Sequence, residues 1–279
     1  MEPAIKHWSH SSIQQFLRCP RQFFFERILG MPVRTTTVGQ ALGSAMHAAL
    51  AVYHRHLRDE PPTRCREKIR EVFLDAWKNR VEAQSLIDAG QHSPVDALDQ
   101  GLALLDLYLE SPSPAGISSV ESLFVAPIHT SAGEYLSWPL FAVLDLVIRA
   151  DERVVVQEFK TLSRTMSQSE ADASLQATCY THALRELFGW EATVEYVCLL
   201  KTKEPKMKRL TTQRSPDDGG RIGDLVQAIE RAIAADAFVP IESPMNCSTC
   251  PYRSPCRDWS IVSPSEMSLV PLTTECLSC

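Results

Sequence analysis

Residues 140–161, LFAVLDLVIRADERVVVQEFKT, decide how the middle of the chain folds. Two runs rich in β-branched and aliphatic residues flank the segment ADER, which has the composition of a tight turn. With the Asp and Glu of ADER at the centre of the turn, the strands pair so that Asp145 stands opposite Glu158. Because side chains alternate along a strand, Asp145, Glu158 and Lys160 then share one face of the sheet, and Phe159 points to the other.

The opposed carboxylates point to a metal site. Two like charges facing each other on a sheet are destabilising, and burial in a mainly apolar run adds to the cost. A divalent cation between Asp145 and Glu158 would turn that cost into a binding site, because Mg²⁺ takes hard oxygen ligands. Lys160 would balance a developing negative charge or help orient a water molecule. The set favours metal-assisted hydrolysis of a phosphodiester. The alternative is a solvated hairpin with a surface ion pair.

Two further motifs stand on either side of this pair, GSAMH at residues 43–47 and QATCY at residues 176–180. No single motif is specific, but the ordered set resembles the RecB-type branch of the PD-(D/E)XK nuclease superfamily over about residues 8–258. That pattern reads G-x-x-x-H, then an Asp on a strand, then (D/E)-x-K on the next strand, then Q-x-x-x-Y. In this sequence it falls on Gly43, His47, Asp145, Glu158, Lys160, Gln176 and Tyr180. Ala142 stands where the family often has Gly, three positions before the Asp.

The resemblance implies a mixed α/β fold with a restriction-endonuclease-like core, in which helices flank a small central mixed sheet. It implies a Mg²⁺ or Mn²⁺ site with four ligands: His47, Asp145, Glu158 and the main-chain carbonyl of Phe159. It implies a catalytic set that consists of Asp145, Glu158, Lys160, Gln176 and Tyr180. In the family the helix with the Gln and the Tyr contacts nucleic acid or orients the catalytic groups. Some relatives also carry a functional acid at the start of a strand, where this chain has Glu121.

A cysteine cluster lies near the other end of the chain, in CSTCPYRSPC at residues 247–256. Three thiols in C-x2-C-x5-C spacing are a strong metal signal. Zinc and a 4Fe–4S cluster both take four protein ligands, so one ligand is missing from this segment. Spacing alone leaves six candidates for it: Cys19, Cys65, Cys179, Cys198, Cys276 and Cys279.

A second resemblance bears on the fourth ligand. AddB-type nuclease domains and CRISPR-associated RecB-like exonucleases have one cysteine before the nuclease motifs, in a C-P-x-x-[FY] context, and three after them. CPRQFF at residues 19–24 matches the first element. The resemblance therefore implies a 4Fe–4S cluster, with zinc as the alternative, on Cys19, Cys247, Cys250 and Cys256. It would join about residues 8–30 to 240–260 as one subdomain. Pro20, which suits a first helical position, would place its preceding cysteine at the joint between two helices.

Length and composition limit the other properties. The chain has 279 residues, 44% of them hydrophobic, which suits one large domain or two small ones. We expect a nuclease domain over residues 1–260 and a Ser/Pro-rich tail over 261–279. No apolar run approaches the roughly 20 residues that span a bilayer. The first residues lack the hydrophobic region of a secretory signal, so we expect a cytoplasmic protein with reduced thiols.

The net charge of −6 is not that of a typical nucleic-acid-binding protein, which is more often basic. Basic residues do cluster in LLKTKEPKMKRL at residues 199–210. We expect contacts to the DNA backbone there, since phosphate attraction is largely independent of sequence. The alternative is a solvated basic hairpin. The residues concerned are Lys201, Lys203, Lys206, Lys208 and Arg209.

Periodicity and capping signals predict the elements around these motifs. Residues 9–30 form two consecutive helices, the first with Ser11 and Gln14 as a capping box. Further helices are predicted at 39–58, 64–84, 95–110, 170–188 and 218–236. Strands are predicted at 120–128, 138–149, 153–160 and 191–201. Helices followed by a small sheet with a crossover helix indicate a mixed α/β domain.

These features predict a metal-dependent deoxyribonuclease, an exonuclease on single-stranded DNA or DNA ends, in recombination, repair or CRISPR adaptation. No P-loop is present, so the enzyme would use single strands, free ends or a helicase partner. The alternative is an iron–sulfur scaffold subunit that binds DNA ends without cutting. Because a scaffold has no need of the opposed carboxylates and their lysine, the first hypothesis is favoured.

Overall fold

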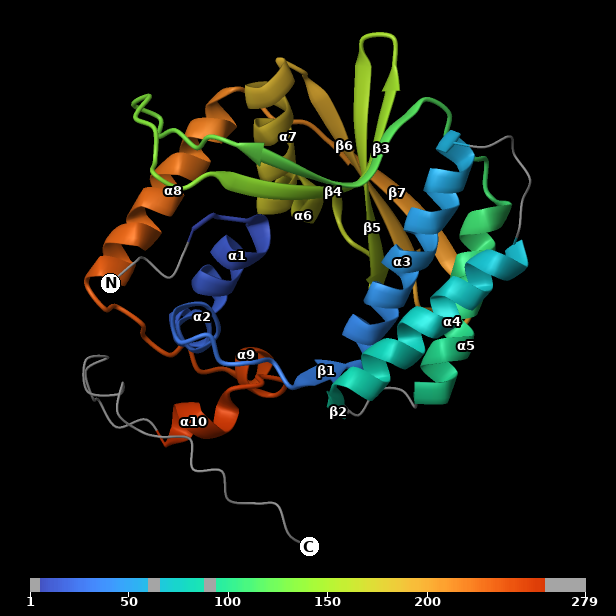
Figure 1. The fold of residues 1–279 in the computed structure, drawn as a ribbon, viewed down its shortest axis with the longest axis horizontal. Coiled ribbons are helices and arrows are strands. Elements are labelled where there is room, and N and C mark those ends of the chain that lie inside the picture. Colours follow the sequence, from blue (N-terminus) through green and yellow to red (C-terminus); the bar gives the residue numbers. More distant parts are fainter. Residues whose placement is uncertain (1–5, 60–65, 88–93, 259–279) are drawn as a thin grey trace, which may run out of the picture.

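The computed structural model describes residues 6–59, 66–87 and 94–258. Its centre is a five-stranded sheet with the order β3-β4-β5-β6-β7, in which only β5 and β6 run parallel (Figure 1). The strands are β3 (Ile117–Ala126), β4 (Leu140–Ala150), β5 (Arg153–Leu162), β6 (Ala192–Leu200) and β7 (Lys206–Thr212). The sheet with its flanking helices confirms the predicted mixed α/β class.

The hairpin of β4 and β5 has the predicted turn and register. Asp151 and Glu152 form the turn, and Ala150 pairs with Arg153 directly behind it. Asp151 takes a φ of 53°, which Asp tolerates better than most residues because its short polar side chain suits the left-handed region. The paired register then continues inward as far as Leu146 and Gln157.

Helices cover both faces of the sheet and divide the core in two. On one face α3 (Val38–Asp59), α4 (Arg66–Ala83) and α5 (Pro94–Glu110) enclose a cluster that includes Leu42, Phe73, Leu104, Leu146 and Phe159. On the other face α1 (His10–Arg18), α7 (Leu175–Phe188) and α8 (Asp217–Ala234) enclose Trp8, Leu144, Val156, Tyr180 and Val226. Val156 and Phe159 of β5, which are an odd number of positions apart, thus contribute to opposite cores, as the alternation along a strand requires.

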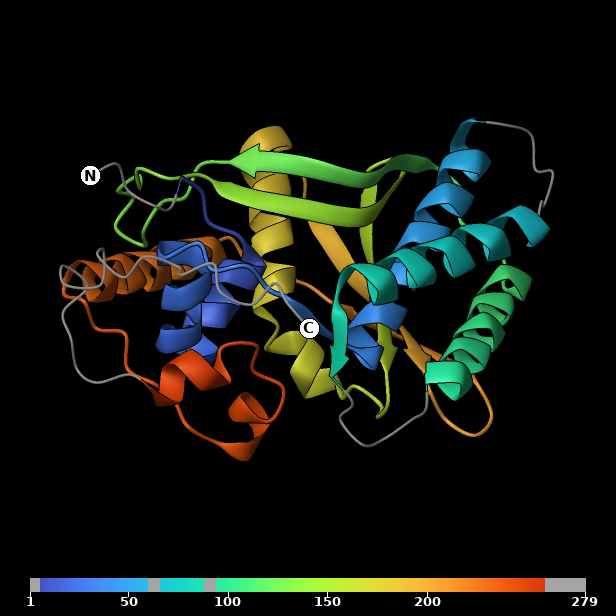
Figure 2. The same ribbon diagram turned by 60° about the horizontal axis from the view of Figure 1, so that its bottom comes forward.

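The two ends of the described chain lie side by side in both ribbon views (Figures 1 and 2). The N-terminal segment continues from α1 through α2 (Pro20–Phe23) and a π-helical turn at Phe24–Ile28, and the C-terminal segment holds α9 (Pro244–Cys247) and α10 (Arg253–Arg257). The amide of Asn246 donates to the carbonyl of Arg18, and the hydroxyl of Tyr252 donates to that of Met31. These contacts join segments more than 200 residues apart in the sequence.

Several predicted boundaries are wrong. The capping box of α1 consists of Ser9 and Ser12, so the helix begins earlier than Ser11 and Gln14 suggested. The predicted helix at 170–188 is two helices, α6 (Gln168–Asp172) and α7, because Ser174 caps a new N-terminus. Strand β7 was predicted only as a loop or basic hairpin; its many exposed charged residues are those of an edge strand.

The parallel pair β1 (Thr35–Thr37) and β2 (Ser85–Ile87) had no sequence signal. The tail, Cys65, Cys276 and Cys279 lie outside the described residues. Within the described ranges, no helix combines the length and apolar character that crossing a bilayer requires.

Candidate active site

The candidate site begins where β4 and β5 part. The paired register ends one residue short of Asp145 and Glu158. Beyond it, the backbone N–H of Phe159 donates to Oδ2 of Asp145 at 2.9 Å. The carboxylate of Asp145 therefore takes the place of the backbone carbonyl that would accept this bond in a paired strand. It is held in the seam between the strands, that is, where β4 and β5 separate, and is almost fully buried there.

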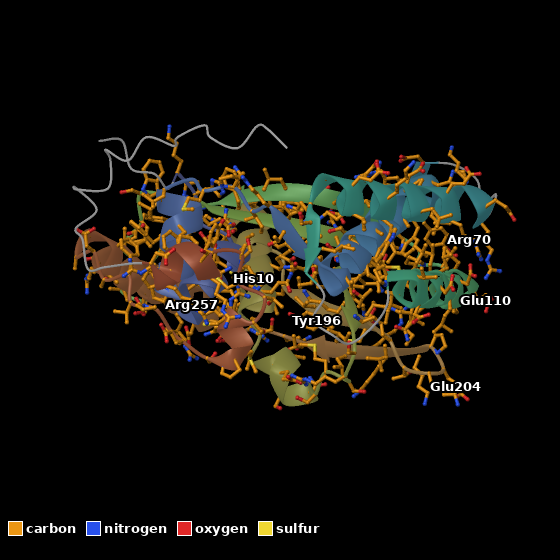
Figure 3. All side chains as sticks on the ribbon, turned by 90° about the horizontal axis from the view of Figure 1, so that it is seen from below. His10, Arg70, Glu110, Tyr196, Glu204 and Arg257 are labelled. Carbon is orange, nitrogen blue, oxygen red and sulfur yellow. The ribbon has the colours of Figure 1, made fainter. Side chains whose placement is uncertain are left out.

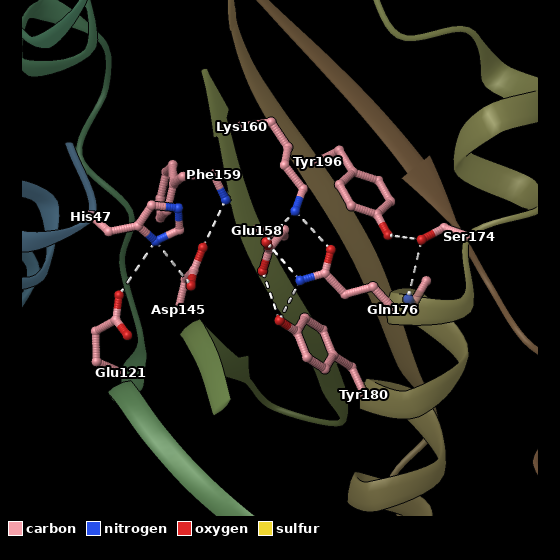
Figure 4. A network of polar contacts seen from close by, with 11 residues as sticks. His47, Glu121, Asp145, Glu158, Phe159, Lys160, Ser174, Gln176, Tyr180 and Tyr196 are labelled. Carbon is pink, nitrogen blue, oxygen red and sulfur yellow. Dashed lines mark hydrogen bonds and ion pairs between the residues drawn. The ribbon is translucent and has the colours of Figure 1, made fainter. Parts of the chain in front are cut away.

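A histidine and a second acid complete this side of the site (Figure 4). His47 projects from α3, with its Nδ1 3.3 Å from Oδ1 of Asp145 and 3.5 Å from Oε1 of Glu121. Ligand atoms of the three side chains all lie within 4.8 Å of one another. Glu121 reaches this position with a φ of 45°, inside strand β3. A left-handed non-glycine residue costs about 1–3 kcal/mol, so the surrounding sheet holds it there.

Glu158 lies on the α7 side and is fixed by three donors. Its Oε1 accepts from Nζ of Lys160 at 2.7 Å and from Nε2 of Gln176 at 2.8 Å, and its Oε2 accepts from the hydroxyl of Tyr180 at 2.9 Å. Gln176 also donates to Tyr180 at 2.7 Å and accepts from Lys160 at 2.8 Å, which fixes the orientation of its amide. A carboxylate has about four lone-pair positions, so one remains open on Oε2.

The titration of these groups follows from their burial and their neighbours. Burial opposes a charged imidazole, but hydrogen bonds to Asp145 and Glu121 outweigh it and raise the pKa of His47 to about 10. Burial, then the charge of Glu158, raises the pKa of Asp145 to about 6. Burial likewise opposes charge on Lys160, but the carboxylate of Glu158 outweighs it and raises the lysine pKa. The carboxylates of the site therefore stabilise positively charged neighbours, here the imidazolium of His47 and the ammonium of Lys160.

The donor set fits a divalent cation. In the absence of an ion, a proton on His47 balances the carboxylates. Carboxylate oxygens with one imidazole nitrogen suit Mg²⁺ or Mn²⁺. Three ligands converge at His47, Glu121 and Asp145. Beside them, the carboxylate of Glu158 contacts Lys160, Gln176 and Tyr180 (Figure 4). Among these possible ligands, Glu121 had the weakest signal in the sequence. Nothing in the sequence reveals the left-handed backbone that brings its side chain to the site.

Lys160 and Tyr180 are both held in their protonated forms. The pKa of Tyr180 is raised well above its usual value, first by burial and then by the charge of Glu158. Its hydroxyl therefore remains a donor to Glu158 at all relevant pH values. Lys160 remains a cation that bridges Glu158 and Gln176.

The predicted basic residues do not form one surface. Cross-strand neighbours Lys160, Cys198 and Lys208 share a face, whereas Arg209 pairs with Val197 on the opposite face. There its guanidinium forms an ion pair with Glu195 at 2.7 Å. Lys201 lies half-buried near the start of α3, and burial lowers its pKa. Lys206 and Lys208 are exposed on the face of β7 that Lys160 shares, and Lys203 is exposed in the loop before that strand.

The N-terminal helix adds a residue that the sequence did not single out. Burial, then the charge of Lys160, lowers the pKa of His10 to about 4, so a neutral imidazole lies beside the site. From below, His10 and Tyr196 lie near the middle of the molecule, between Arg257 on one side and Arg70 and Glu110 on the other (Figure 3). His10 also borders a mainly polar cavity of about 470 Å³ between α1 and the β1–β2 pair.

The cysteines predicted as a cluster all line one other cavity, of about 560 Å³: Cys19, Cys247, Cys250 and Cys256. Burial raises the pKa of Cys250 and Cys256, and neighbouring thiols raise it further. A zinc ion with Zn–S bonds of about 2.3 Å brings its sulfurs to about 3.8 Å from one another. Within the described residues, no three thiols lie within 4.8 Å of one another. Cys179 and Cys198 lie in the core instead.

Comparisons with known proteins identify the fold and the superfamily. A structure named "Putative exonuclease", from Eubacterium rectale, aligns over 95% of this chain and 94% of its own with a TM-score of 0.54 and 10% identity. A second structure, SSO0001, covers 92% of this chain and 98% of its own at 15% identity, but its TM-score of 0.31 is too low to support an argument. No curated protein matches the sequence. The family model of the PD-(D/E)XK nuclease superfamily matches residues 7–257, and the chain belongs to that superfamily.

Proposed function

We propose that the chain is a RecB-type, metal-dependent deoxyribonuclease, an exonuclease that acts on single-stranded DNA or DNA ends. The superfamily implies a nucleic acid substrate. One observation carries the proposal: at the parting of β4 and β5, Asp145 and Glu158 adjoin a protonated Lys160 and the imidazole of His47. A structural ion pair would need neither the second histidine–carboxylate contact nor the partly buried lysine.

Different residues would bind the metal ion and stabilise the charge on the phosphate. His47, Glu121, Asp145, the open position of Glu158 and the carbonyl of Phe159 would hold Mg²⁺ or Mn²⁺. The ion supplies a Lewis acid for the phosphate and lowers the pKa of a bound water. Because its pKa is raised, Lys160 does not act as a general base; it stabilises negative charge that develops on the phosphate.

Gln176 and Tyr180 act as positioning residues. Each contacts Glu158, and Gln176 also contacts Lys160, so together they fix the acid and the cation relative to each other. We propose that they orient the catalytic groups and have no direct part in the chemistry. Such supporting contacts are typically worth about 10–100-fold in metal affinity or activity.

The cavity beside His10 supports single strands as the substrate. A volume of about 470 Å³ takes a short stretch of single strand and is too small for a duplex. Arg18, Arg27 and Arg80 line it. The guanidinium groups of these arginines would contact phosphates of the strand.

Lys203, Lys206 and Lys208 would extend this path by contacts to phosphates. Lys208 lies on the same face as Lys160, two strands away. Arg209 and Lys201 would contribute less, since one is paired and the other is half-buried.

We further propose a 4Fe–4S cluster on Cys19, Cys247, Cys250 and Cys256, with zinc as the alternative. All four cysteines line one cavity, which supports a single group shared among them. Its role would be structural, since it would join the two ends of the domain. The visible spectrum of protein purified without oxygen distinguishes the two: an iron–sulfur chromophore supports the cluster, and a colourless protein with bound zinc rejects it.

The biological setting would be recombination, repair or CRISPR adaptation, with a helicase or adaptation protein as partner. The alternative function is an iron–sulfur scaffold that holds DNA ends. The cysteine cavity is compatible with both, but the ordered network around Glu158 favours the enzyme.

A cleavage assay tests the proposal. Single strands and duplexes labelled at either end are incubated with the protein and Mg²⁺ or Mn²⁺. We expect progressive shortening of single strands, and a loss of about 10³-fold or more in Asp145→Asn. Asn keeps an acceptor for the N–H of Phe159, so the fold should survive. Asp151→Asn at the turn of the same hairpin is the matched control. Tight binding of ends with no cleavage by wild type would establish the scaffold instead.

A further inference from the structure

Three rings meet on the face of the sheet that carries α3, behind the main chain of the candidate site. The imidazole of His54 stacks on the ring of Phe159, with centroids 5.3 Å apart and an interplanar angle of 18°. The ring of Tyr108 meets Phe159 edge-on, with centroids also 5.3 Å apart and an angle of 88°. All three residues are almost fully buried. The ring of Phe159 is therefore held from two directions.

His54 and Tyr108 also hold each other. Nε2 of the imidazole lies 2.9 Å from the hydroxyl oxygen of the tyrosine, and their rings are 5.7 Å apart at 87°. Burying polar groups is costly unless they are hydrogen-bonded, and an apolar pair would fill the same core without that requirement. A hydrogen bond has a preferred direction, which an apolar contact lacks. The pair therefore fixes the planes of both rings as well as their positions.

These rings lie where β4 no longer holds β5. The paired register of the two strands ends at Leu146 and Gln157, two positions before Phe159. On its other side Phe159 still pairs with Val197 of β6. Towards β4, only the bond from its N–H to Asp145 is left. The ring contacts therefore add a restraint on the backbone of Phe159 at the point where the ladder to β4 has stopped.

Helix α3 contacts both partners of that bond. His47 and His54 are seven residues apart on α3, close to two helical turns, so they lie on the same face of the helix. His47 approaches Asp145 at 3.3 Å, and His54 stacks on Phe159. The geometry of His47, Asp145 and the backbone of Phe159 thus depends on how α3 packs against β5, which the stacked rings help to set.

We propose that His54 and Tyr108 are positioning residues for the metal site, although neither supplies a ligand. By fixing the ring of Phe159 they fix its main chain, whose N–H binds Asp145 and whose carbonyl is a proposed ligand. The inference rests on the proposed function and extends it to the opposite face of the sheet. Contacts that support metal ligands are typically worth about 10–100-fold in metal affinity or activity.

Three variants separate the two side chains from their surroundings. His54→Gln removes the ring that stacks on Phe159 and keeps a polar partner for Tyr108. Tyr108→Phe removes only a hydroxyl, so it keeps the test available if the first variant does not fold. Tyr53→Phe is its matched control: that ring also lies beside His54, but its hydroxyl contacts Ser113.

A fourth variant controls for lost stability. Phe73 is fully buried in the same core and packs beside Gly101. Phe73→Leu should lower the melting temperature without moving the backbone of Phe159. Any change that His54→Gln shares with Phe73→Leu is then a consequence of a weaker core alone.

Two measurements that need no DNA test the inference. Calorimetric titration gives the Mn²⁺ affinity, and hydrogen exchange in metal-free protein follows the amide of Phe159 relative to the amides of β6. We expect about tenfold weaker Mn²⁺ binding in His54→Gln, a smaller loss in Tyr108→Phe, and relatively faster exchange of the Phe159 amide in both. Tyr53→Phe and Phe73→Leu should match wild type in both measurements.

Wild-type Mn²⁺ affinity in both His54→Gln and Tyr108→Phe overturns the inference. An equal loss in Phe73→Leu overturns it too, because the effect would then follow from stability alone. A wild type that binds Mn²⁺ and cuts no DNA overturns the proposed nuclease instead, since the comparison of affinities still decides the role of His54.

Discussion

The carboxylate site and the cysteine cavity are held together in different ways. At the carboxylate site, Asp145 is bound by a backbone N–H and Glu158 by three side-chain donors, so the protein alone fixes the geometry. The cysteines instead line a cavity in which burial, and then the charges of neighbouring cysteines, raises the pKa of Cys250 and Cys256. The charge of Arg21 offsets this only in part, because the pKa of Cys256 remains raised.

This difference predicts which of the two proposed metal groups stabilises the fold. Removing a divalent ion from a preorganised site should cost activity and leave the fold intact. Removing the proposed group from the cysteines should lower the free energy of unfolding. Its binding energy would then no longer offset the chain entropy that is lost when the two cysteine-bearing segments become ordered. The following predictions test that division, from the largest expected effect to the smallest.

The largest effect is expected for Cys19→Ser. Loss of a ligand that connects the two ends of the domain should lower the free energy of unfolding by about 3 kcal/mol or more. Urea denaturation and the visible spectrum measure the two consequences together. Cys65→Ser removes a cysteine outside the proposed set and should change neither. Stability in Cys19→Ser equal to that of wild type would show that the cavity holds no structural group.

Tyr180→Phe removes one donor to Glu158 and should lower both the Mn²⁺ affinity and kcat by about 10–100-fold. Its melting temperature should change little, because the ring remains packed. Tyr196→Phe is the matched control: its hydroxyl contacts Ser174 and not Glu158. If both tyrosine variants lose activity equally, the network around Glu158 has no positioning role.

Acid should destabilise the side of the sheet that carries α3. Burial lowers the pKa of His54 to about 3, and its ring stacks on that of Phe159. The unfolded chain binds a proton below about pH 6.5 and the folded chain does not. Stability should therefore fall between about pH 6 and 4 by about 1.4 kcal/mol per pH unit from this group. Urea melts at several pH values should show a shallower slope for His54→Gln; an identical slope refutes the assignment.

The smallest effect concerns the basic loop. Removing one lysine that binds a phosphate should reduce the slope of log K against log salt by about 0.7 for single strands. Lys203→Ser, Lys206→Ser and Lys208→Ser should each flatten it. Arg209→Ser should not, because that guanidinium pairs with Glu195 on the opposite face. If the salt slopes of all four variants equal that of wild type, the loop does not contact the DNA.

The sequence predicted the hairpin and most of the site because short-range rules determine both. A two-residue turn at Asp151 and Glu152 fixes the register of β4 and β5, and the register places Asp145 near Glu158. Alternation then places Lys160 beside Glu158. The helices that carry His47 and Gln176 were predicted from periodicity, and the ordered motifs identified these residues.

Features that depend on contacts between distant parts of the chain could not be predicted from the sequence. Asp145 was expected to share a face with Glu158, yet it turns towards His47 in the seam between the strands. The position of Glu121 depends on one left-handed residue. The basic loop was treated as one surface although the strand β7 divides it between two faces, a consequence of a pairing that the sequence did not reveal.

Hydrogen exchange tests the central claim most directly. Amide exchange is followed in protein with all metals, in protein treated with EDTA, and in protein that has lost the group on its cysteines. We predict that the amide of Phe159 stays protected after EDTA, because its acceptor on Asp145 does not depend on an ion. Amides of α2, α9 and α10 should exchange faster only when the cysteine-bound group is lost. Rapid exchange of Phe159 after EDTA alone, with the cysteine segments unchanged, would contradict the account.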